Sequence, residues 1–326
     1  MNRSVSLMLV VLGAAFLAVS CSAFFTSPSA YQPDSPYGNS SSDPADRDEF
    51  TNVYSNYLGF SPDRLYTDGG VLHAFYNNVD SRYSYNALAP SLTFVSASNL
   101  YSVDTGFYNY GVLGNDKFLY GPSANSPGYL TKYNSTNFSI VSTSTNSNAN
   151  PSDFFAVTDT RSIYLRRTDN TTSIDFRMVR YTKGALWPVP VSNDMLMGTS
   201  TVKYLALIGV VGERVYLTAE DRFYRRSKIY SFDASLSSPA LSEITAFTST
   251  FTNSDVDCKC AAISGNDLYM VVYGPGYKYV LARFNTQTGS FDKMKSSVPW
   301  GDRMKVVGGD VLYRANGGDL LGYRVK

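Results

Sequence analysis

The sequence predicts an all-β fold assembled from a repeated four-stranded unit, and three observations lead to this prediction. The chain of 326 residues contains 26 Tyr and 19 Phe, and aromatic rings are enriched in strands, where they pack on pleated surfaces. A hairpin of apolar and aromatic residues recurs along the chain. No helical period of adequate length follows the first 20 residues, so strands are expected to form the core.

The clearest hairpin lies within residues 260–289. Residues 268–273 form an unbroken apolar and aromatic run, which is typical of a strand covered on both faces. Gly-Pro-Gly at 274–276 is incompatible with a helix and predicts a turn. Apolar residues then alternate with others over 280–285 before the polar turn NTQTG. We therefore expect two antiparallel strands here.

This hairpin recurs six times, marked by a turn followed by a hydrophobic and an aromatic residue. Successive markers are 47, 44, 52, 53 and 44 residues apart, which is within the range of a four-stranded propeller blade. Most copies of the second strand end with an aromatic residue before Asn, Asp or Thr, as suits a ring packed between sheets. The marker positions are His73, Tyr120, Tyr164, Tyr216, Tyr269 and Tyr313.

Shorter apolar pieces supply the remaining two strands of each repeat. The sequences LTFVSA, FSIVST, LWPVPV and FDKMK are expected to be outer strands, and FFAVTD, YLALIGVVG and CAAISG are expected to be inner strands. Four strands in each of six repeats predict a six-bladed β-propeller. Residues 50–326 thus resemble bacterial propellers with degenerate repeats, without the WD40, kelch or sialidase signatures. A stacked β-sandwich and a seven-bladed ring with one degenerate blade are the alternatives.

The last repeat ends at LLGYRVK, directly after its third strand. A sheet that stopped there would expose unpaired backbone groups at its edge. The segment EFTNVYSNYLGF, residues 49–60, has strand-forming content and no blade of its own. We therefore expect an N-terminal strand to close the last blade, with both chain ends in one sheet.

The N-terminus carries an export signal, predicted over residues 1–20. Arg3 is followed by an apolar run of 16 residues, which is shorter than the roughly 20 residues needed to span a membrane. The sequence LAVSC resembles the bacterial lipobox, although Ala18 stands where Leu is usual. The resemblance implies lipidation of Cys21. Cleavage by ordinary signal peptidase after Ser20 or Ala23, which would give a secreted protein, is the alternative.

Residues 21–49 are predicted to be a lipidated N-terminus and flexible tether because they are rich in Ser, Pro, Asp and Asn and show no apolar period. The propeller domain is predicted over residues 50–326. The formal net charge is +1, which argues against a nucleic-acid partner because phosphate binding requires a basic excess or a dense basic face.

Few residues offer catalytic or metal-binding chemistry. His73 is the single histidine and stands where the other five markers have Tyr, so we interpret it as a packing residue rather than a catalytic base. Cys258 and Cys260 are interpreted as buried thiols, with a strained, redox-labile bridge as the alternative. A zinc site would need further ligands, and no Asp-rich loop of the calcium-binding type is found. We predict no cofactor, no metal and no catalytic residue.

Five arginines form the best candidate binding surface. Two are predicted at the end of the middle strand of the third repeat and three in the equivalent loop of the fourth, and these loops of adjacent blades share one face of a propeller. Guanidinium groups there could bind a carboxylate, a sulfate or an acidic partner, and a self-neutralised rim with Asp169, Glu220 and Asp221 is the alternative. A second candidate is sugar stacking on Tyr129, Tyr277 and Tyr279, with turn packing as the alternative. The predicted ligand-binding residues are Arg166, Arg167, Arg222, Arg225 and Arg226.

These observations predict a monomeric propeller lipoprotein, anchored in the cell envelope by its lipid, that acts as a non-enzymatic binding or scaffolding module. Its partner is expected to be an envelope protein or a glycan. The alternative is an exported propeller enzyme that acts on glycans through Asp and Glu carboxylates. An enzyme would need at least two buried carboxylates near an open end of the axis, whereas a scaffold would not.

Overall fold

In the residues that it describes, the computed structural model consists mainly of four-stranded antiparallel sheets. The predictions of a signal peptide, a lipidated Cys21 and a tether fall on residues 1–48 and lie outside the described residues. The structure describes residues 49–325 except 69, 77–78, 100–111, 114–117, 123–129, 138, 144–153, 170–173, 184–191, 201, 222–226, 251–255, 275–277 and 316–317.

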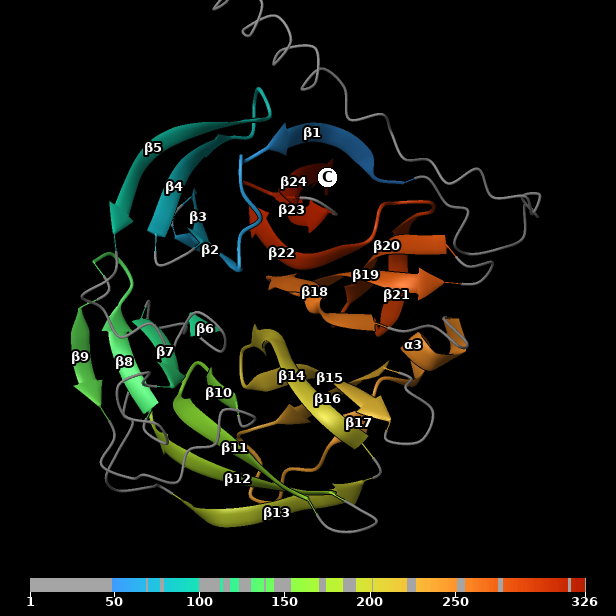
Figure 1. Ribbon diagram of the computed structural model, residues 1–326. Coiled ribbons are helices and arrows are strands. Elements are labelled where there is room, and N and C mark those ends of the chain that lie inside the picture. Colours follow the sequence, from blue (N-terminus) through green and yellow to red (C-terminus); the bar gives the residue numbers. More distant parts are fainter. Residues whose placement is uncertain are drawn as a thin grey trace, which may run out of the picture. The chain divides into compact units, whose positions relative to one another are not determined.

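The first three sheets each contain four antiparallel strands that are consecutive in the chain (Figure 1). The first sheet contains β2 (Arg64–Asp68), β3 (Val71–Tyr76), β4 (Val79–Asn86) and β5 (Ser91–Asn99). The second contains β6 (Val112–Leu113), β7 (Phe118–Pro122), β8 (Leu130–Asn134) and β9 (Ile140–Thr143). The third contains β10 (Phe154–Val157), β11 (Arg161–Asp169), β12 (Ile174–Thr182) and β13 (Ser192–Ser200).

The last three sheets repeat this arrangement, and the sixth combines both ends of the described chain. The fourth contains β14 (Val202–Val211), β15 (Arg214–Asp221), β16 (Ser227–Asp233) and β17 (Ser242–Glu243). The fifth contains β18 (Val256–Ser264), β19 (Asp267–Gly274), β20 (Lys278–Asn285) and β21 (Ser290–Lys295). The sixth contains β22 (Gly301–Val307), β23 (Asp310–Ala315), β24 (Asp319–Arg324) and β1 (Thr51–Tyr57).

The marker residues are buried in all six sheets, as their repeated spacing indicates. Each lies on the second strand of its sheet and is at most 6% exposed: His73, Tyr120, Tyr164, Tyr216, Tyr269 and Tyr313. Five of the six aromatic residues that end the second predicted strand are also buried: Tyr133, Tyr181, Phe232, Phe284 and Tyr323. The sixth, Tyr85, is partly buried. The prediction that the hairpin supplies the middle pair of strands is confirmed, with β19 and β20 as the example.

Neighbouring sheets share the core. The hydroxyl of Tyr66 in the first sheet donates to the backbone carbonyl of Ser135 in the second, at 2.9 Å. Apolar clusters join the other pairs, including the sixth sheet with the first. These clusters bring together Tyr120 and Tyr164, Leu165 and Leu217, Ile229 and Met270, Leu281 and Val311, and Leu312 and Leu72.

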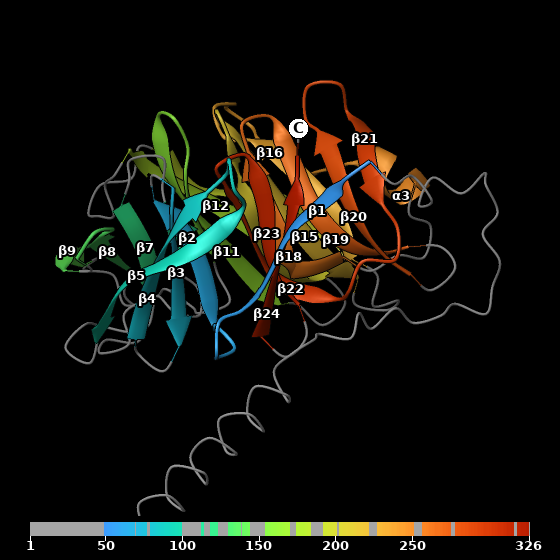
Figure 2. The ribbon, with the colours of Figure 1, turned by 90° about the horizontal axis from the view of Figure 1, so that it is seen from above.

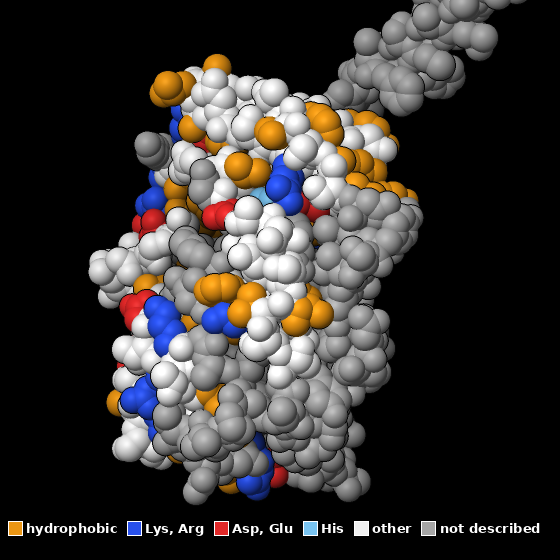
Figure 3. Space-filling view, turned by 90° about the vertical axis from the view of Figure 1, so that its left-hand side faces the viewer, with side chains coloured by type: hydrophobic (Ala, Val, Ile, Leu, Met, Phe, Trp, Pro, Cys, Tyr) orange, Lys and Arg blue, Asp and Glu red, His pale blue; other side chains and the backbone are white. Residues whose placement is uncertain are grey.

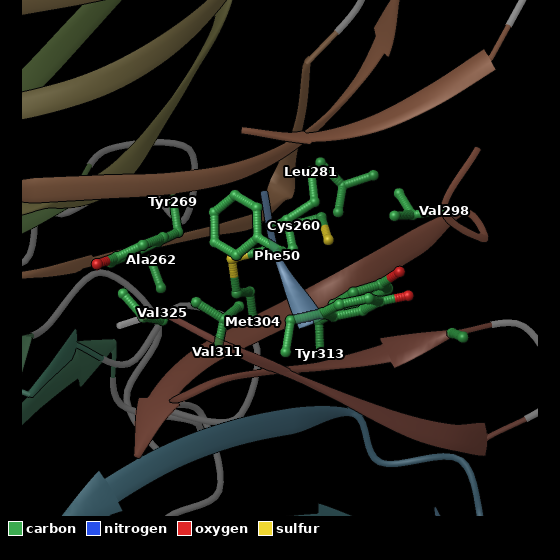
Figure 4. Packing of buried hydrophobic residues seen from close by; sticks show 13 residues of the cluster. Phe50, Cys260, Ala262, Tyr269, Leu281, Val298, Met304, Val311, Tyr313 and Val325 are labelled. Carbon is green, nitrogen blue, oxygen red and sulfur yellow. The ribbon is translucent and has the colours of Figure 1, made fainter. Parts of the chain in front are cut away.

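The cluster between the fifth and sixth sheets includes the start of the described chain (Figure 4). Phe50, which is 1% exposed, packs there with Cys260, Met304 and Tyr313. Burial of an aromatic side chain of this size contributes about 1.5–3 kcal/mol. Residues just before β1 are therefore part of the core.

The N-terminal strand β1 pairs antiparallel with β24, from Thr51 opposite Arg324 to Tyr57 opposite Asp319. Figure 2 shows β1 beside β24. The pairing requires a residue without a side chain at Gly322, where a Cβ atom would lie 2.7 Å from Leu312 and 2.9 Å from Tyr54. This is the pairing that the sequence predicts for the segment before the first repeat.

Two elements differ from the sequence prediction. Residues 245–250 form a short helix, α3 (Thr245–Thr250), although no helix is predicted after the signal. The outer strand of the third sheet is β13, which begins at Ser192, whereas the prediction places it at LWPVPV, residues 186–191. Both errors concern the outer edge of a sheet, where the apolar pattern is weakest because one side of the strand has no partner.

We expect the β1–β24 pairing to hold the domain together. Deletion of residues 1–60 removes two buried aromatic residues, Phe50 and Tyr54, and should lower the free energy of unfolding by roughly 3–6 kcal/mol. Deletion of residues 1–45 should leave it unchanged. Urea denaturation of both truncated chains and the mature chain measures the difference, and equal midpoints for all three would contradict a stabilising role for β1.

Candidate functional site

A buried cluster of charged residues lies in the first sheet. Nδ1 of His73 is 3.1 Å from both carboxylate oxygens of Asp80, and Nε of Arg82 donates to the same carboxylate at 2.7 Å. Asp80 is fully buried and His73 is 4% exposed. The carboxylate therefore fixes the orientation of the imidazole ring and balances the charge of the guanidinium group.

This cluster also binds the next sheet. The imidazole ring of His73 stacks on Tyr66 with the ring centroids 4.2 Å apart. Arg82 donates from a terminal nitrogen to the carbonyl of Thr136 at 3.0 Å. Burial, followed by the nearby charge of Asp80, raises the pKa of Tyr66 far above its ordinary value. His73 is thus buried among residues of its own sheet, at the position where the other markers have Tyr. Its interpretation as a packing residue rather than a catalytic base stays a prediction.

Two further buried carboxylates bind arginines in the sixth sheet. Asp302 receives two hydrogen bonds from Arg314. Arg314 also donates to Ser61 and to the carbonyl of Pro62 in the segment after β1. At the other end of this sheet, Asp310 accepts from Arg324 and from the hydroxyl of Tyr85. Burial and this hydrogen bond raise the pKa of Tyr85.

The separation of Asp302 and Asp310 bears on glycan hydrolysis. Asp302 lies near the start of β22, whereas Asp310 pairs with Val307 at its end. Five residues of strand at roughly 3.3 Å each place them roughly 17 Å apart. Carboxylates that act together on a glycosidic bond lie about 5–9.5 Å apart. These two carboxylates therefore cannot form such a pair.

The predicted arginine surface lies mostly outside the described atoms. The backbones of Arg166 and Arg167 lie in β11, opposite Arg177 and Phe176 of β12. Their side chains, and the whole of Arg222, Arg225 and Arg226, fall outside the described part of the structure. The surface stays a prediction.

The predicted aromatic and cysteine sites are described only in part. Tyr129 and Tyr277 fall outside the described residues. Tyr279 is partly buried, with its ring centroid 5.1 Å from that of Tyr273. Cys260 is a buried thiol, whereas the side chain of Cys258 is not described. Across the described residues, no group of three or more His, Cys, Asp or Glu side chains could hold a metal ion.

The sequence analysis missed two exposed apolar pairs, one on each of the first two sheets, which together we call the outer apolar patch: Phe94 with Val95, and Ile140 with Val141. These residues are 51–58% exposed and lie on the outermost strands β5 and β9. Figure 3 views this flank, where hydrophobic side chains, in orange, reach the surface. The similar sequences LTFVSAS and FSIVSTS carry a signal for this patch, because both place two adjacent apolar residues on an outer strand.

Positive charges also meet on the inner strands. Lys305 of β22 and Arg64 of β2 lie on adjacent inner strands, and burial together with the charge of Arg64 lowers the pKa of Lys305 to about 8.

In the part of the chain that the structure describes, no helix is long and apolar enough to cross a membrane.

We expect Asp80→Asn to destabilise the fold, because it leaves the Arg82 charge in the interface without its partner. Loss of one member of a buried ion pair costs about 3 kcal/mol or more. The matched control is Asp292→Asn, which removes the more exposed partner of Arg283 and should cost about 1 kcal/mol or less. Urea denaturation measures both changes. Equal losses would contradict a structural role for the buried cluster.

Stability should pass through a maximum near pH 10. The pKa of Lys305 is lowered in the folded state, so the folded protein binds fewer protons than the unfolded chain between about pH 8 and pH 10.5, and stability rises with pH there. Burial raises the pKa values of Tyr54 and Tyr269 to about 12, so stability falls again above pH 10.

We expect the rise to be roughly 1–3 kcal/mol, nearer the lower value because Lys305 is partly accessible to solvent. Lys305→Met should abolish it and leave the fall above pH 10 unchanged. Urea midpoints measured at several pH values between 7 and 11 give the comparison. A rise that persisted in Lys305→Met would show that another group is responsible.

Comparison with known proteins gives likenesses of fold only. No protein-family model and no curated protein sequence matches the chain. BamB from Moraxella catarrhalis is 10% identical over 85% of this chain and 98% of that chain, with a TM-score of 0.36. A putative exported protein from Bacteroides fragilis is 12% identical over 85% and 95%, with a TM-score of 0.46.

The β-propeller domain of the trilobed protease from Pyrococcus furiosus is 10% identical over 80% of this chain and 76% of that chain, with a TM-score of 0.45. These neighbours are β-propeller proteins. The chain is all-β, and its six four-stranded sheets fit six blades of such a fold.

Proposed function

We propose that this chain is a lipoprotein of the cell envelope, anchored through Cys21, whose six-bladed propeller is closed by β1 and acts as a non-enzymatic binding or scaffolding module. The partner is an envelope protein or a glycan. The exposed outer apolar patch is the observation that carries this proposal. Phe94 with Val95, and Ile140 with Val141, are adjacent exposed apolar residues, and burial of such surface against a partner is favourable.

The hydrogen bonds that the buried carboxylates make to arginines support a non-enzymatic role. A catalytic carboxylate needs access to substrate and a proton-transfer path. Asp80, Asp302 and Asp310 are instead bonded to arginines, and these arginines also bind backbone carbonyls of other segments. Their hydrogen-bonding capacity is thus used to join parts of the fold.

The predicted arginine surface gives the proposal a second binding face. Arg166, Arg167, Arg222, Arg225 and Arg226 would bind an acidic partner, and that binding should weaken with added salt because the charges are exposed to solvent. The outer apolar patch should bind with little dependence on salt, since its residues are uncharged. Salt dependence therefore separates the two faces.

The test is capture of a partner by the full-length chain in the membranes of the cells that produce it. We expect one envelope component to be recovered in constant proportion to the chain, and mass spectrometry to find an acylated Cys21 at the mature N-terminus. Cys21→Ala should release the chain from the membrane fraction, whereas Cys260→Ala, which changes a buried thiol, should stay membrane-bound.

Two results would contradict the proposal. One is an unmodified N-terminus in a chain found only in the soluble fraction, which would remove the anchor. The other is release of sugars from envelope glycans by the purified chain, lost on substitution of an Asp or Glu residue, which would support the alternative of an exported glycan-degrading enzyme.

A further inference from the structure

Three sheets share one β-bulge at their outer strand. In the first sheet, Arg82 and Tyr83 of β4 pair with Ser96 and Phe94 of β5, so that Val95 is the additional residue. The second sheet repeats this pairing with Val141 as the additional residue, and the fifth sheet repeats it with Asp292. The bulge follows the marker in the same register, since His73, Tyr120 and Tyr269 pair with Arg82, Lys132 and Arg283.

In the fifth sheet, the same chain covers this bulge. Phe291, at the position of Phe94, packs against the cluster that contains Phe247 of the short helix α3, with the two ring centroids 6.1 Å apart. Asp292, at the position of Val95, binds Arg283 through both carboxylate oxygens at 2.7 and 2.8 Å. An apolar residue from elsewhere and an ion pair therefore complete this edge.

In the first two sheets, the described residues provide no such cover. Phe94 and Ile140 occupy the position of Phe291 and are 57% and 53% exposed. Val95 and Val141 occupy the position of Asp292 and are 58% and 51% exposed. Neither β5 nor β9 contains a charged residue. Two equivalent bulges on neighbouring sheets thus present aliphatic and aromatic side chains to solvent.

The other outer edges have features that discourage pairing with another chain. The fourth sheet ends in β17, a strand of two residues. On the fifth, Asp292 and Lys293 are charged, and Glu49 exchanges hydrogen bonds with Met294. Short edge strands and charges of this kind protect sheets from unwanted association. The outer strands of the first two sheets contain no charged residue, and each presents two adjacent exposed apolar side chains.

We propose that the outer apolar patch binds a polypeptide segment of an envelope partner, whose aromatic or large aliphatic side chains cover both bulges as Phe247 covers Phe291. This inference rests on the proposed function and names the binding surface and the chemistry of the partner. The contact region of the segment is apolar, because it covers exposed apolar side chains on strands that contain no charged residue.

The test places a photoreactive benzoylphenylalanine at position 94 or 140 of the full-length chain, in the cells that produce it. Leu236, which is 52% exposed on the fourth sheet's turn, is the matched control position. We expect one polypeptide, the same from positions 94 and 140, to be cross-linked, and no such product from position 236.

The double variant Val95→Asp, Val141→Asp is designed to weaken binding of the partner to the outer apolar patch. The fold should accept these changes, because Asp292 occupies the same bulge beside a cation at the position of Arg82 and Lys132. We expect the yield of the cross-linked product to fall about tenfold or more, as for residues central to an interface. Leu236→Asp should leave the yield unchanged, and urea midpoints near that of the parent chain should show that each variant is folded.

Several outcomes would overturn the inference. They are no product from positions 94 and 140, equal products from position 236, a product that contains lipid alone, and a product that joins two copies of this chain. Capture of a partner by the full-length chain without a product at 94 or 140 would reject the patch and leave the proposed function standing. The absence of any partner would reject the proposed function itself.

Discussion

The structure depends on the packing of each sheet against both of its neighbours. A four-stranded sheet that is apolar on both faces is unstable in water by itself, because each uncovered face exposes buried-type side chains. Here Tyr120 and Tyr313 are fully buried, although both lie on sheets of only four strands. Their cover comes from adjacent sheets. The first sheet also contacts the sixth, and residues 53–60 contribute to that junction.

Arginine side chains also join neighbouring sheets through hydrogen bonds to backbone carbonyls. Arg82 donates to Thr136 in the second sheet, Arg180 donates to Ala234 in the fourth, and Arg324 donates to Ala87 in the first. A buried carbonyl without a hydrogen bond costs free energy, and a guanidinium group with several donors can satisfy a carbonyl and a carboxylate at once. These arginines thus connect neighbouring repeats. Burial lowers the pKa of Arg180.

The sequence predicted the parts of the fold that a repeated local pattern specifies. The markers and the hairpins follow from the alternation of apolar residues. The N-terminal strand within residues 49–60 follows from the unpaired edge of the last repeat. The joints could not be predicted, because Arg180 and Ala234 are far apart in sequence and no local signal connects them. The outer strands were predicted less well, since β17 has only two residues and the bulges at Val95 and Val141 depend on pairing register rather than on composition.

A binding surface can arise on the outer strands of this fold more readily than on the inner and middle strands, because the outer strands make fewer contacts. Inner and middle strands have neighbours on both faces, so a change at Tyr269 or Leu281 disturbs two sheets at once. Outer strands have a free edge, and the chain completes equivalent edges in different ways. A helix and an ion pair cover Phe291 and Asp292, whereas Phe94 and Ile140 stay exposed at the same register. One bulge geometry thus serves as an internal joint in the fifth sheet and leaves an apolar surface in the first two. A partner that supplied the missing apolar cover would use a contact that this fold already makes within itself.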